Sequence, residues 1–219
     1  QSGELKSADL IVFDADPPKV YRDLIPAKHR SKWTDKRLGR LSFSMGLFVW
    51  YFGTSRSYPG VEHHTIIMGK AFKELLKDIY GRKILSDDLS LYLHRPSATD
   101  PSMAPKDGDA FYVLAPVPNK LANIDWREAG ERIRMQVQTQ LEKTLLPGLG
   151  DCLKVSHFVT PDDFEGKFNT LWGSGFSIAP LFRQSAWFRF HNRSEDLENL
   201  YFCGAGTHPG AGVPGVVSS

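Results

Sequence analysis

The residues with the clearest chemical potential form a glycine-rich run near the end of the sequence. After Asn199-Leu-Tyr-Phe-Cys, which is typical of a short strand, glycine fills five of the twelve positions from 204 to 215. Such a run has few side chains to pack and lets the backbone approach a flat or phosphorylated ligand closely. Pro214 suits the first turn of a helix, whose free N–H groups and positive dipole end favour a partly negative group. A flavin fits this description, because its pyrimidine end gains negative charge on reduction.

The first glycines of the run do not by themselves establish a cofactor site. Gly204, Gly206 and Gly210 miss the dinucleotide fingerprint G-x-G-x-x-G, because the third glycine comes one residue late and follows a proline. Taken alone, this near match could equally be a structural loop.

A second candidate site is aromatic. Six aromatic residues lie between positions 172 and 190, set among small residues. Apolar side chains of this kind line the sites of long apolar ligands. A core beneath a long loop would have the same composition, so both interpretations stay open at this point.

Few side chains suggest proton transfer. His208 could be an acid–base group, but a histidine before Pro-Gly could equally be a structural hydrogen-bonding residue. We interpret His157 and His191 as structural. The acidic cluster of Asp162, Asp163 and Glu165 follows Thr160-Pro161 and favours helix capping. The sequence therefore predicts no particular catalytic residue.

The elements that would position these groups alternate between strands and helices, which predicts a mixed α/β or α+β fold. The apolar runs predict strands over 10–13 (buried), 43–52, 89–94, 110–115, 153–159 and 199–203. Helices are expected over about 18–24, over 69–80 with Gly81 as the stop, and over 125–145. The last has the most regular pattern, since Asp125 and Glu128 have capping-box spacing and an apolar residue recurs every four positions from Ile133.

The composition excludes several classes of protein. With 219 residues, 41% hydrophobic residues and a net charge of +2, the chain is not disordered and lacks a nucleic-acid-binding charge balance. The longest mostly apolar stretch, 41–53, is too short for a membrane-spanning helix, and early charges argue against a signal peptide. Cys152 and Cys203 lie far apart, which favours reduced thiols in a cytoplasmic protein, and no metal site is predicted.

A basic segment lies near the start of the chain. Residues 19–40 contain eight Lys or Arg residues against two Asp, with Trp33 in the middle. Such a run is either a solvated helical face or a patch for an anionic membrane surface.

A longer match gives these features a context. The run 199–213 resembles the C-terminal signature of the bacterial-type phytoene desaturases, which are FAD-dependent enzymes of carotenoid biosynthesis. The segments 94–105, 111–118 and 171–180 are similar to the same family, so the resemblance spans the chain. Members of this family are about twice as long and begin with a strand, a G-x-G-x-x-G turn and a helix that bind the ADP part of FAD. We therefore expect this sequence to be the C-terminal portion of a larger flavoprotein.

The resemblance implies a Rossmann-type FAD domain interleaved with a mixed-sheet substrate domain. Residues 1–24 and 199–219 would belong to the FAD domain, and residues 25–198 to the substrate and membrane-associated domain. The implied flavin contacts are Gly204, Ala205, Gly206, Thr207, Gly212, Val213 and Pro214. The resemblance also favours the ligand-site interpretation of the aromatic loop, with Trp172, Phe176 and Phe182 as walls of a substrate tunnel.

The implied reaction removes two vicinal hydrogens from phytoene or a related carotene, one as a hydride to the flavin and one as a proton. A lipid-dissolved substrate implies a cytoplasmic enzyme attached peripherally to the membrane, without nucleic acid as a partner; a homo-oligomer is left open. Two alternatives remain. Another flavin-dependent polyene enzyme, an isomerase, saturase or oxygenase, would keep the cofactor, whereas the chain alone could be an inactive fragment without bound cofactor.

Overall fold

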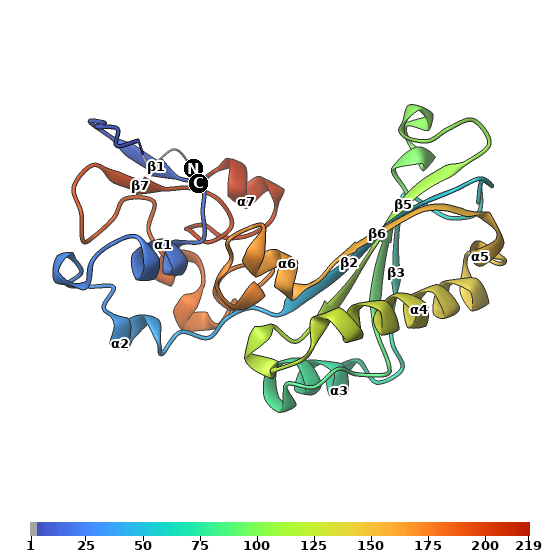
Figure 1. Ribbon diagram of the computed structural model, residues 1–219, viewed down its shortest axis with the longest axis horizontal. Coiled ribbons are helices and arrows are strands. Elements are labelled where there is room, and N and C mark those ends of the chain that lie inside the picture. The colour runs from blue at the N-terminus through green and yellow to red at the C-terminus, as the bar shows by residue number, and fades with distance from the viewer. Residues whose placement is uncertain (1–3) are drawn as a thin grey trace. The chain divides into compact units, whose positions relative to one another are not determined.

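A computed structural model describes residues 4–219 of the chain, which divides into two compact units. The first unit joins residues up to 44 with residues 168–219, and the second comprises residues 45–167. Each unit has its own cluster of buried apolar side chains. Helices and strands occur in both (Figure 1), so the mixed α/β character predicted from the sequence is confirmed.

The unit boundaries differ from the domain boundaries predicted after residues 24 and 198. The reason is that the intervening segments supply Trp33, Phe43, Leu171 and Phe190 to the same buried cluster as Leu200. These segments therefore fold as parts of the first unit. Their assignment to a cofactor or a substrate domain stays a prediction.

The second unit is built on a five-stranded sheet in the order β3-β4-β5-β2-β6. Each neighbouring pair is antiparallel. The strands are β2 (Gly46–Thr54), β3 (His64–Ile67), β4 (Leu91–His94), β5 (Asp109–Val117) and β6 (Leu153–Val159). The sequence did not predict β3, because four residues at the edge of a sheet carry too short a pattern to detect.

The helices of the second unit are α3 (Phe72–Lys77), α4 (Trp126–Thr144), α5 (Leu149–Cys152) and α6 (Pro161–Gly166). The start of α4 is as predicted, since Asp125 accepts hydrogen bonds from the backbone N–H groups of Arg127 and Glu128. The helix predicted over 69–80 is wrong at both ends: α3 is shorter, and a π-helical turn, Asp78–Arg82, continues through Gly81. The stop comes at Lys83, whose φ of 57° is left-handed.

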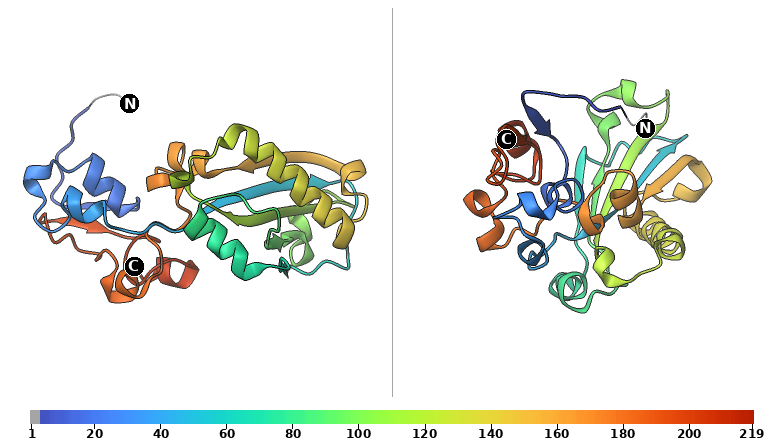
Figure 2. Two further views of the ribbon diagram at one scale, coloured as in Figure 1. Left: turned by 90° about the horizontal axis from the view of Figure 1, so that it is seen from below. Right: turned by 60° about the vertical axis from the view of Figure 1, so that its left-hand side comes forward.

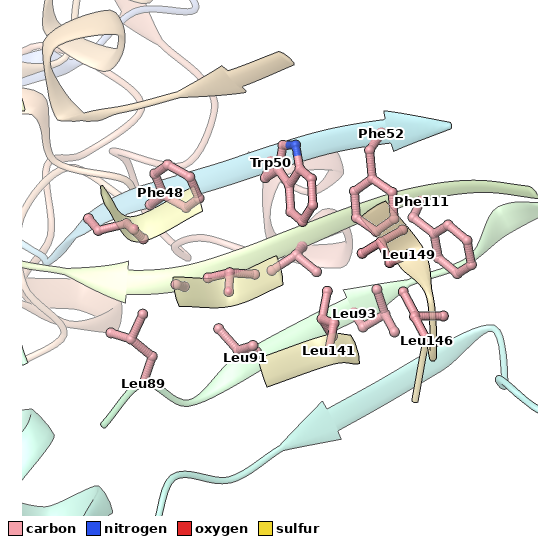
Figure 3. Packing of buried hydrophobic residues seen from close by; sticks show 14 of the residues in the cluster. Phe48, Trp50, Phe52, Leu89, Leu91, Leu93, Phe111, Leu141, Leu146 and Leu149 are labelled. Carbon is pink, nitrogen blue, oxygen red and sulfur yellow. The ribbon is translucent and has the colours of Figure 1, made fainter. Parts of the chain in front are cut away.

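One face of this sheet packs on α4 and forms the larger core (Figures 2 and 3). Alternate residues of each central strand point into it, as the two-residue period of a strand requires. The core includes Phe48, Trp50 and Phe52 of β2, Leu91 and Leu93 of β4, Phe111 and Val113 of β5, and Ile133, Val137 and Leu141 of α4.

The opposite face of the sheet is more open. It carries Tyr51, which lies opposite both Tyr112 and His157 in the register. Val155 of β6 and Ile66 of β3 are exposed. Along β2, both faces are buried from Gly46 to Trp50, whereas Tyr51 is exposed.

The first unit contains a two-stranded parallel sheet and short helices. Its elements are β1 (Ile11–Phe13), α1 (Pro17–Asp23), α2 (Asp35–Leu38), β7 (Leu200–Phe202) and α7 (Val213–Val217). The positions of β1, α1 and β7 agree with the sequence prediction, but the expected burial of β1 is wrong. Ile11 and Val12 are 49% and 56% exposed, because a two-stranded sheet leaves one of its strands uncovered.

Aromatic rings fill the core of the first unit. Trp33 stacks on Phe190 with ring centroids 4.0 Å apart, and Tyr21 contacts both Phe190 and Phe202. Such ring pairs contribute about 0.5–1.5 kcal/mol beyond the area that they bury.

Within residues 4–219, no helix combines the length and the apolar character needed to cross a bilayer.

Candidate functional site

The parallel pairing of β1 with β7 brings the start of the first unit beside the glycine-rich run. Ile11 pairs with Leu200 and Phe13 with Phe202, and the backbone N–H of Cys203 donates to the carbonyl of Phe13 at 3.0 Å. Asp14 and Gly204 therefore follow their strands at the same edge of the small sheet. In open α/β sheets, this carboxyl-end edge is where ligands bind.

The first half of the glycine-rich run is buried and packs against the chain itself. Gly204 has a φ of +94°, and a Cβ there would collide with the carboxylate of Asp14. A Cβ on Gly206 would collide with the ring of Pro17. Both positions require glycine for internal packing, whether or not a ligand is bound.

Thr207 holds this buried half together. Its side chain is fully buried, and its hydroxyl donates to the carbonyl of Gly204 at 2.9 Å. The N–H of Gly204 in turn donates to the hydroxyl of Ser219 at 2.7 Å. The structure thus gives Thr207 a backbone hydrogen bond, and its contact with a flavin stays a prediction.

The second half of the run is exposed, and it contains a spacing that was missed from the sequence. Gly210, Gly212 and Gly215 match G-x-G-x-x-G and lead into α7. Gly210 and Gly212 have φ values of +134° and +102°, and a Cβ on Gly215 would lie 2.6 Å from the carbonyl oxygen of Gly210. The match differs from the usual fingerprint because a turn, rather than β7 itself, precedes it.

The predicted flavin contacts thus divide into two groups. Gly204, Gly206 and Thr207 are buried and build the turn, and Ala205 is half-buried. Gly212, Val213 and Pro214 are exposed, and the space above the missing Cβ of Gly212 is open. Only the second group offers its backbone to a ligand from solvent.

Arg189 links the glycine-rich run to the aromatic loop, and sequence reasoning missed it. Its buried guanidinium donates to the carbonyls of Ala205 at 2.7 Å, Phe176 at 2.8 Å and Ile178 at 3.2 Å. Burial lowers the pKa of Arg189, and the charge of Asp16 opposes this shift. The position of Arg189 between Phe188 and Phe190 could have revealed this role, because a cation buried in an aromatic run needs several hydrogen-bond acceptors.

Asp16 is the buried carboxylate of the same unit. One of its oxygens accepts the backbone N–H of Leu171 at 2.7 Å, which fixes the start of the aromatic loop. Burial raises the pKa of Asp16 above its usual value. A buried cation and a buried anion therefore hold the two ends of this loop.

The aromatic loop is part core and part surface. Phe190 is buried, whereas Phe182 is 85% exposed and Trp187 is 67% exposed. Trp172 lies 5.8 Å from the guanidinium of Arg22, and Phe182 contacts Phe188 with centroids 6.0 Å apart. The core interpretation thus holds for Phe190, and the ligand-site interpretation of the exposed residues stays a prediction. The tunnel role of Trp172, Phe176 and Phe182 stays a prediction, and Phe182 is too exposed to line a closed cavity within this unit.

The histidines and acids considered for proton transfer have mostly structural contacts. The ring of His191 contacts the carbonyl of Trp187 and the carboxylate of Glu195, both at 3.0 Å. Asp163 caps the N–H of Thr160, and Lys120 pairs with Asp162 and Glu165. His208 donates its backbone N–H to the carbonyl of Phe190, while its Nδ1 is buried and has no hydrogen-bond partner within residues 4–219. His157 is exposed on β6.

The open face of the second unit's sheet holds an apolar groove of about 540 Å³ that the sequence did not reveal. Burial, followed by the nearby Tyr92 hydroxyl, raises the pKa of Tyr112 to about 12, so its hydroxyl stays neutral. The sequence feature that could have revealed this groove is that Tyr112 and His94 alternate with core residues along β5 and β4. The groove is lined mainly by Tyr51, His94, Met103, Tyr112, Val155 and His157.

The basic segment 19–40 is largely engaged within the first unit. Lys19 and Arg22 pair with Asp23, Arg30 pairs with Asp35, and Lys32 pairs with Glu195. The guanidinium of Arg37 lies 4.4 Å from the ring of Trp33, which is buried. Lys28, Lys36 and Arg40 are exposed.

Comparisons with known proteins show which proteins the chain is similar to. The chain is 46% identical, over its whole length, to a neurosporene-forming phytoene desaturase of Cereibacter sphaeroides, and 44% identical over 99% of its length to a lycopene-forming phytoene desaturase of Pseudescherichia vulneris. It spans 43% and 44% of these relatives. No family model matches it. A crystal structure of an oxidoreductase from Methanosarcina mazei matches 98% of this chain and 42% of its own, with a TM-score of 0.59 at 14% identity, which shows the fold alone.

Proposed function

Because this chain is homologous along its whole length to bacterial phytoene desaturases, we propose that the full-length protein is an FAD-dependent oxidoreductase that removes vicinal hydrogens from phytoene or a related carotene. The observation that carries this proposal is the 46% identity over the entire chain. Since the chain spans 43% of that relative, the proposal concerns the activity of the full-length protein.

The glycine-rich run has the properties that a flavin site needs. Gly210 and Gly212 have left-handed φ values, and the side above Gly212 is open. Gly212, Val213 and Pro214 would contact the ring system, with the buried turn at Gly204–Thr207 holding them in place. Bound FAD would supply the hydride acceptor. The role of Arg189 is to fix the carbonyl of Ala205 and thereby the shape of this turn.

An uncharged carotene must be held by apolar contact and by exclusion of water. In the first unit, Trp172, Phe176 and Phe182 are the proposed tunnel residues, and the exposed Phe182 would need to be covered by another part of the full-length protein. In the second unit, the groove beside Tyr51 and Tyr112 offers a further apolar surface, and the hydroxyl of Tyr112 stays uncharged at neutral pH.

The test is product analysis of the full-length protein with FAD and phytoene in liposomes. We expect phytoene to disappear and carotenes with longer conjugation, and hence absorption at longer wavelength, to form. Unchanged phytoene beside conversion of another polyene would replace this proposal with an isomerase, saturase or oxygenase.

A variant with Gly212→Val should lose flavin absorbance, whereas Gly60→Val, in the open surface of the second unit, should keep it.

We also propose that the exposed cations of the basic segment help the protein dock on anionic lipid. Each Lys or Arg near such a surface contributes about 1 kcal/mol at low salt. Replacement of Lys28, Lys36 and Arg40 by Gln should therefore reduce co-sedimentation with phosphatidylserine vesicles. The matched control replaces the exposed Lys70, Lys73 and Lys83 of the second unit. Equal losses in both variants would argue against this docking surface.

A further inference from the structure

Three histidines converge at one edge of the second unit's sheet, outside the residues proposed to hold the flavin. His63 immediately precedes β3, His64 is the first residue of β3, and His94 is the last residue of β4. His64 and His94 are directly opposite in the antiparallel register. The N–H of Arg95 donates to the carbonyl of His63 at 2.9 Å, which fixes the third backbone beside them. One side-chain nitrogen from each histidine lies within 4.8 Å of the other two.

The rings are oriented by neighbouring hydroxyl groups. The Nδ1 of His64 contacts the hydroxyl of Tyr92 at 2.6 Å, and the Nδ1 of His63 contacts the hydroxyl of Thr99. These contacts leave the Nε2 atoms of both rings for another partner. The Nε2 of His63 already lies 2.8 Å from the Nε2 of His94. Metal-binding histidines have this arrangement, in which one ring nitrogen is held by an oxygen and the other is a ligand.

His94 would bind through the Nε2 atom that faces His63. Its other ring nitrogen, Nδ1, is buried and has no hydrogen-bond partner among the described residues. Because one imidazole presents only one nitrogen to a given ion, the position of Nε2, and not the orphan Nδ1, places His94 in the trio.

We propose that His63, His64 and His94 bind a divalent transition metal ion of the zinc class, with a fourth coordination position left for water or another ligand. Nitrogen ligands favour Zn²⁺, Co²⁺, Ni²⁺ or Cu²⁺ over Ca²⁺ and Mg²⁺. Tetrahedral Zn–N bonds of about 2.0–2.1 Å separate the ligand nitrogens by about 3.3 Å. The observed separations, from 2.8 Å to within 4.8 Å, bracket this value, so modest ring rotations would complete the site.

The site would fasten the edge of the sheet. β3 has four residues and, in the part of the chain that the structure describes, pairs only with β4. Elements with few contacts open locally more easily than core strands do. A metal bound by residues of both strands would hold them together. No sequence pattern reveals the site, because His94 lies 31 residues from His63 and no spacing motif connects them. The prediction of no metal site rested on the two cysteines.

The competing interpretation is a hydrogen-bonded imidazole pair that needs no metal. The two are separated by titrating the tag-free full-length protein, stripped with a chelator, with Co²⁺ and Zn²⁺. We expect one equivalent of Co²⁺ to bind with the visible absorption of a four-coordinate site, and Zn²⁺ to displace it. A folded wild-type chain that takes up no stoichiometric metal would overturn the proposal.

Variants then locate the metal. His64→Ala should weaken binding at least 10-fold, and Tyr92→Phe, which removes only the hydroxyl that orients His64, should weaken it about 10-fold. His157→Ala is the matched control, because His157 is an exposed histidine of the same sheet outside the trio. Circular dichroism checks that each variant is folded. If His64→Ala fails to fold, Tyr92→Phe decides, and unchanged affinity in that variant would overturn the assignment.

Discussion

The two units of this chain reach their structures by different means. The second unit is a five-stranded antiparallel sheet with a helix of 19 residues on one face. The first unit has two three-residue strands, and much of its chain lies in loops. Both units bury charged side chains, Asp16 and Arg189 in the first and Arg95 and Asp109 in the second, so they differ mainly in how much of the backbone lies in hydrogen-bonded ladders. Regular ladders therefore specify the second unit, whereas the loops of the first depend on individual polar contacts.

This difference bears on function. The residues proposed to contact the flavin lie in the first unit, where the backbone leaves regular structure and exposes its N–H groups. Loops held on a rigid support are the usual place for binding residues. The second unit offers a broad apolar sheet surface, which suits a substrate without charge.

The largest effect is expected from removing a side chain from the apolar core of the second unit. Trp50 is fully buried, stacks on Phe52 at 4.2 Å and donates its indole N–H to Ser156 at 2.9 Å. Trp50→Ala should lower the free energy of unfolding of this unit by about 3–5 kcal/mol. Urea denaturation followed by circular dichroism measures the loss. Val155→Ala, at an exposed position of the same sheet, should change it by less than about 0.5 kcal/mol.

The next prediction addresses the polar contacts of the first unit. Arg189→Met keeps much of the side-chain volume but leaves the carbonyls of Phe176, Ile178 and Ala205 without their donor. Each unsatisfied buried acceptor costs about 1–3 kcal/mol, part of which water can recover, so we expect a total loss near 3 kcal/mol. Hydrogen exchange should rise at β1 and β7 while β5 keeps its protection. Equal loss of protection in β5 would show that the units unfold together and would break the comparison.

The same contrast explains what could be predicted from the sequence. Strands β4, β5 and β6 and helix α4 have apolar patterns and caps that local sequence encodes, and all four were predicted near their observed bounds. The contacts of Arg189 join residues 11 to 16 positions apart in irregular backbone, where no periodicity exists to detect. The exposure of β1 was also missed, since an apolar run does not say how many strands will cover it. The glycine-rich run was recognised as a candidate site, but its division into a buried and an exposed half depends on contacts with Asp14 and Pro17.

A smaller loss of stability is expected from adding a methyl group to Gly215, where packing leaves no room for it, than from the two preceding changes. A Cβ on Gly215 would lie 2.6 Å from the carbonyl oxygen of Gly210, so Gly215→Ala must displace the turn before α7. We expect a loss of about 1–3 kcal/mol in the first unit, read as increased hydrogen exchange at residues 204–217. Gly166→Ala is the control in the second unit, because Gly166 ends α6 with nothing within 4 Å of the added Cβ. If both variants behave alike, the turn is more adaptable than its contacts indicate.

The smallest expected effect is a difference in pH response between two buried carboxylates. In the second unit, Asp109 pays for its burial but accepts the N–H of Tyr58 and pairs with Arg95 at 3.0 Å, so its pKa is lowered. Its contribution to stability is therefore present above the pKa of Asp109 in the unfolded chain and is lost as the pH falls through its pKa in the folded protein.

In the first unit, burial dominates and raises the pKa of Asp16. Ionisation of Asp16 at neutral pH therefore costs stability. Protonation restores that stability as the pH falls from the pKa of Asp16 in the folded protein towards its pKa in the unfolded chain. Asp16→Asn should remove this dependence, because the amide stays neutral while its oxygen can still accept the N–H of Leu171. Hydrogen exchange at residues 171–174 between pH 7 and pH 4, corrected for the intrinsic exchange rates, should show protection rising on acidification in the wild type and staying flat in Asp16→Asn. Parallel profiles in the two proteins would mean that Asp16 is not the group that titrates, and that the polar contacts of the first unit tolerate its charge as well as those of Asp109 do in the second.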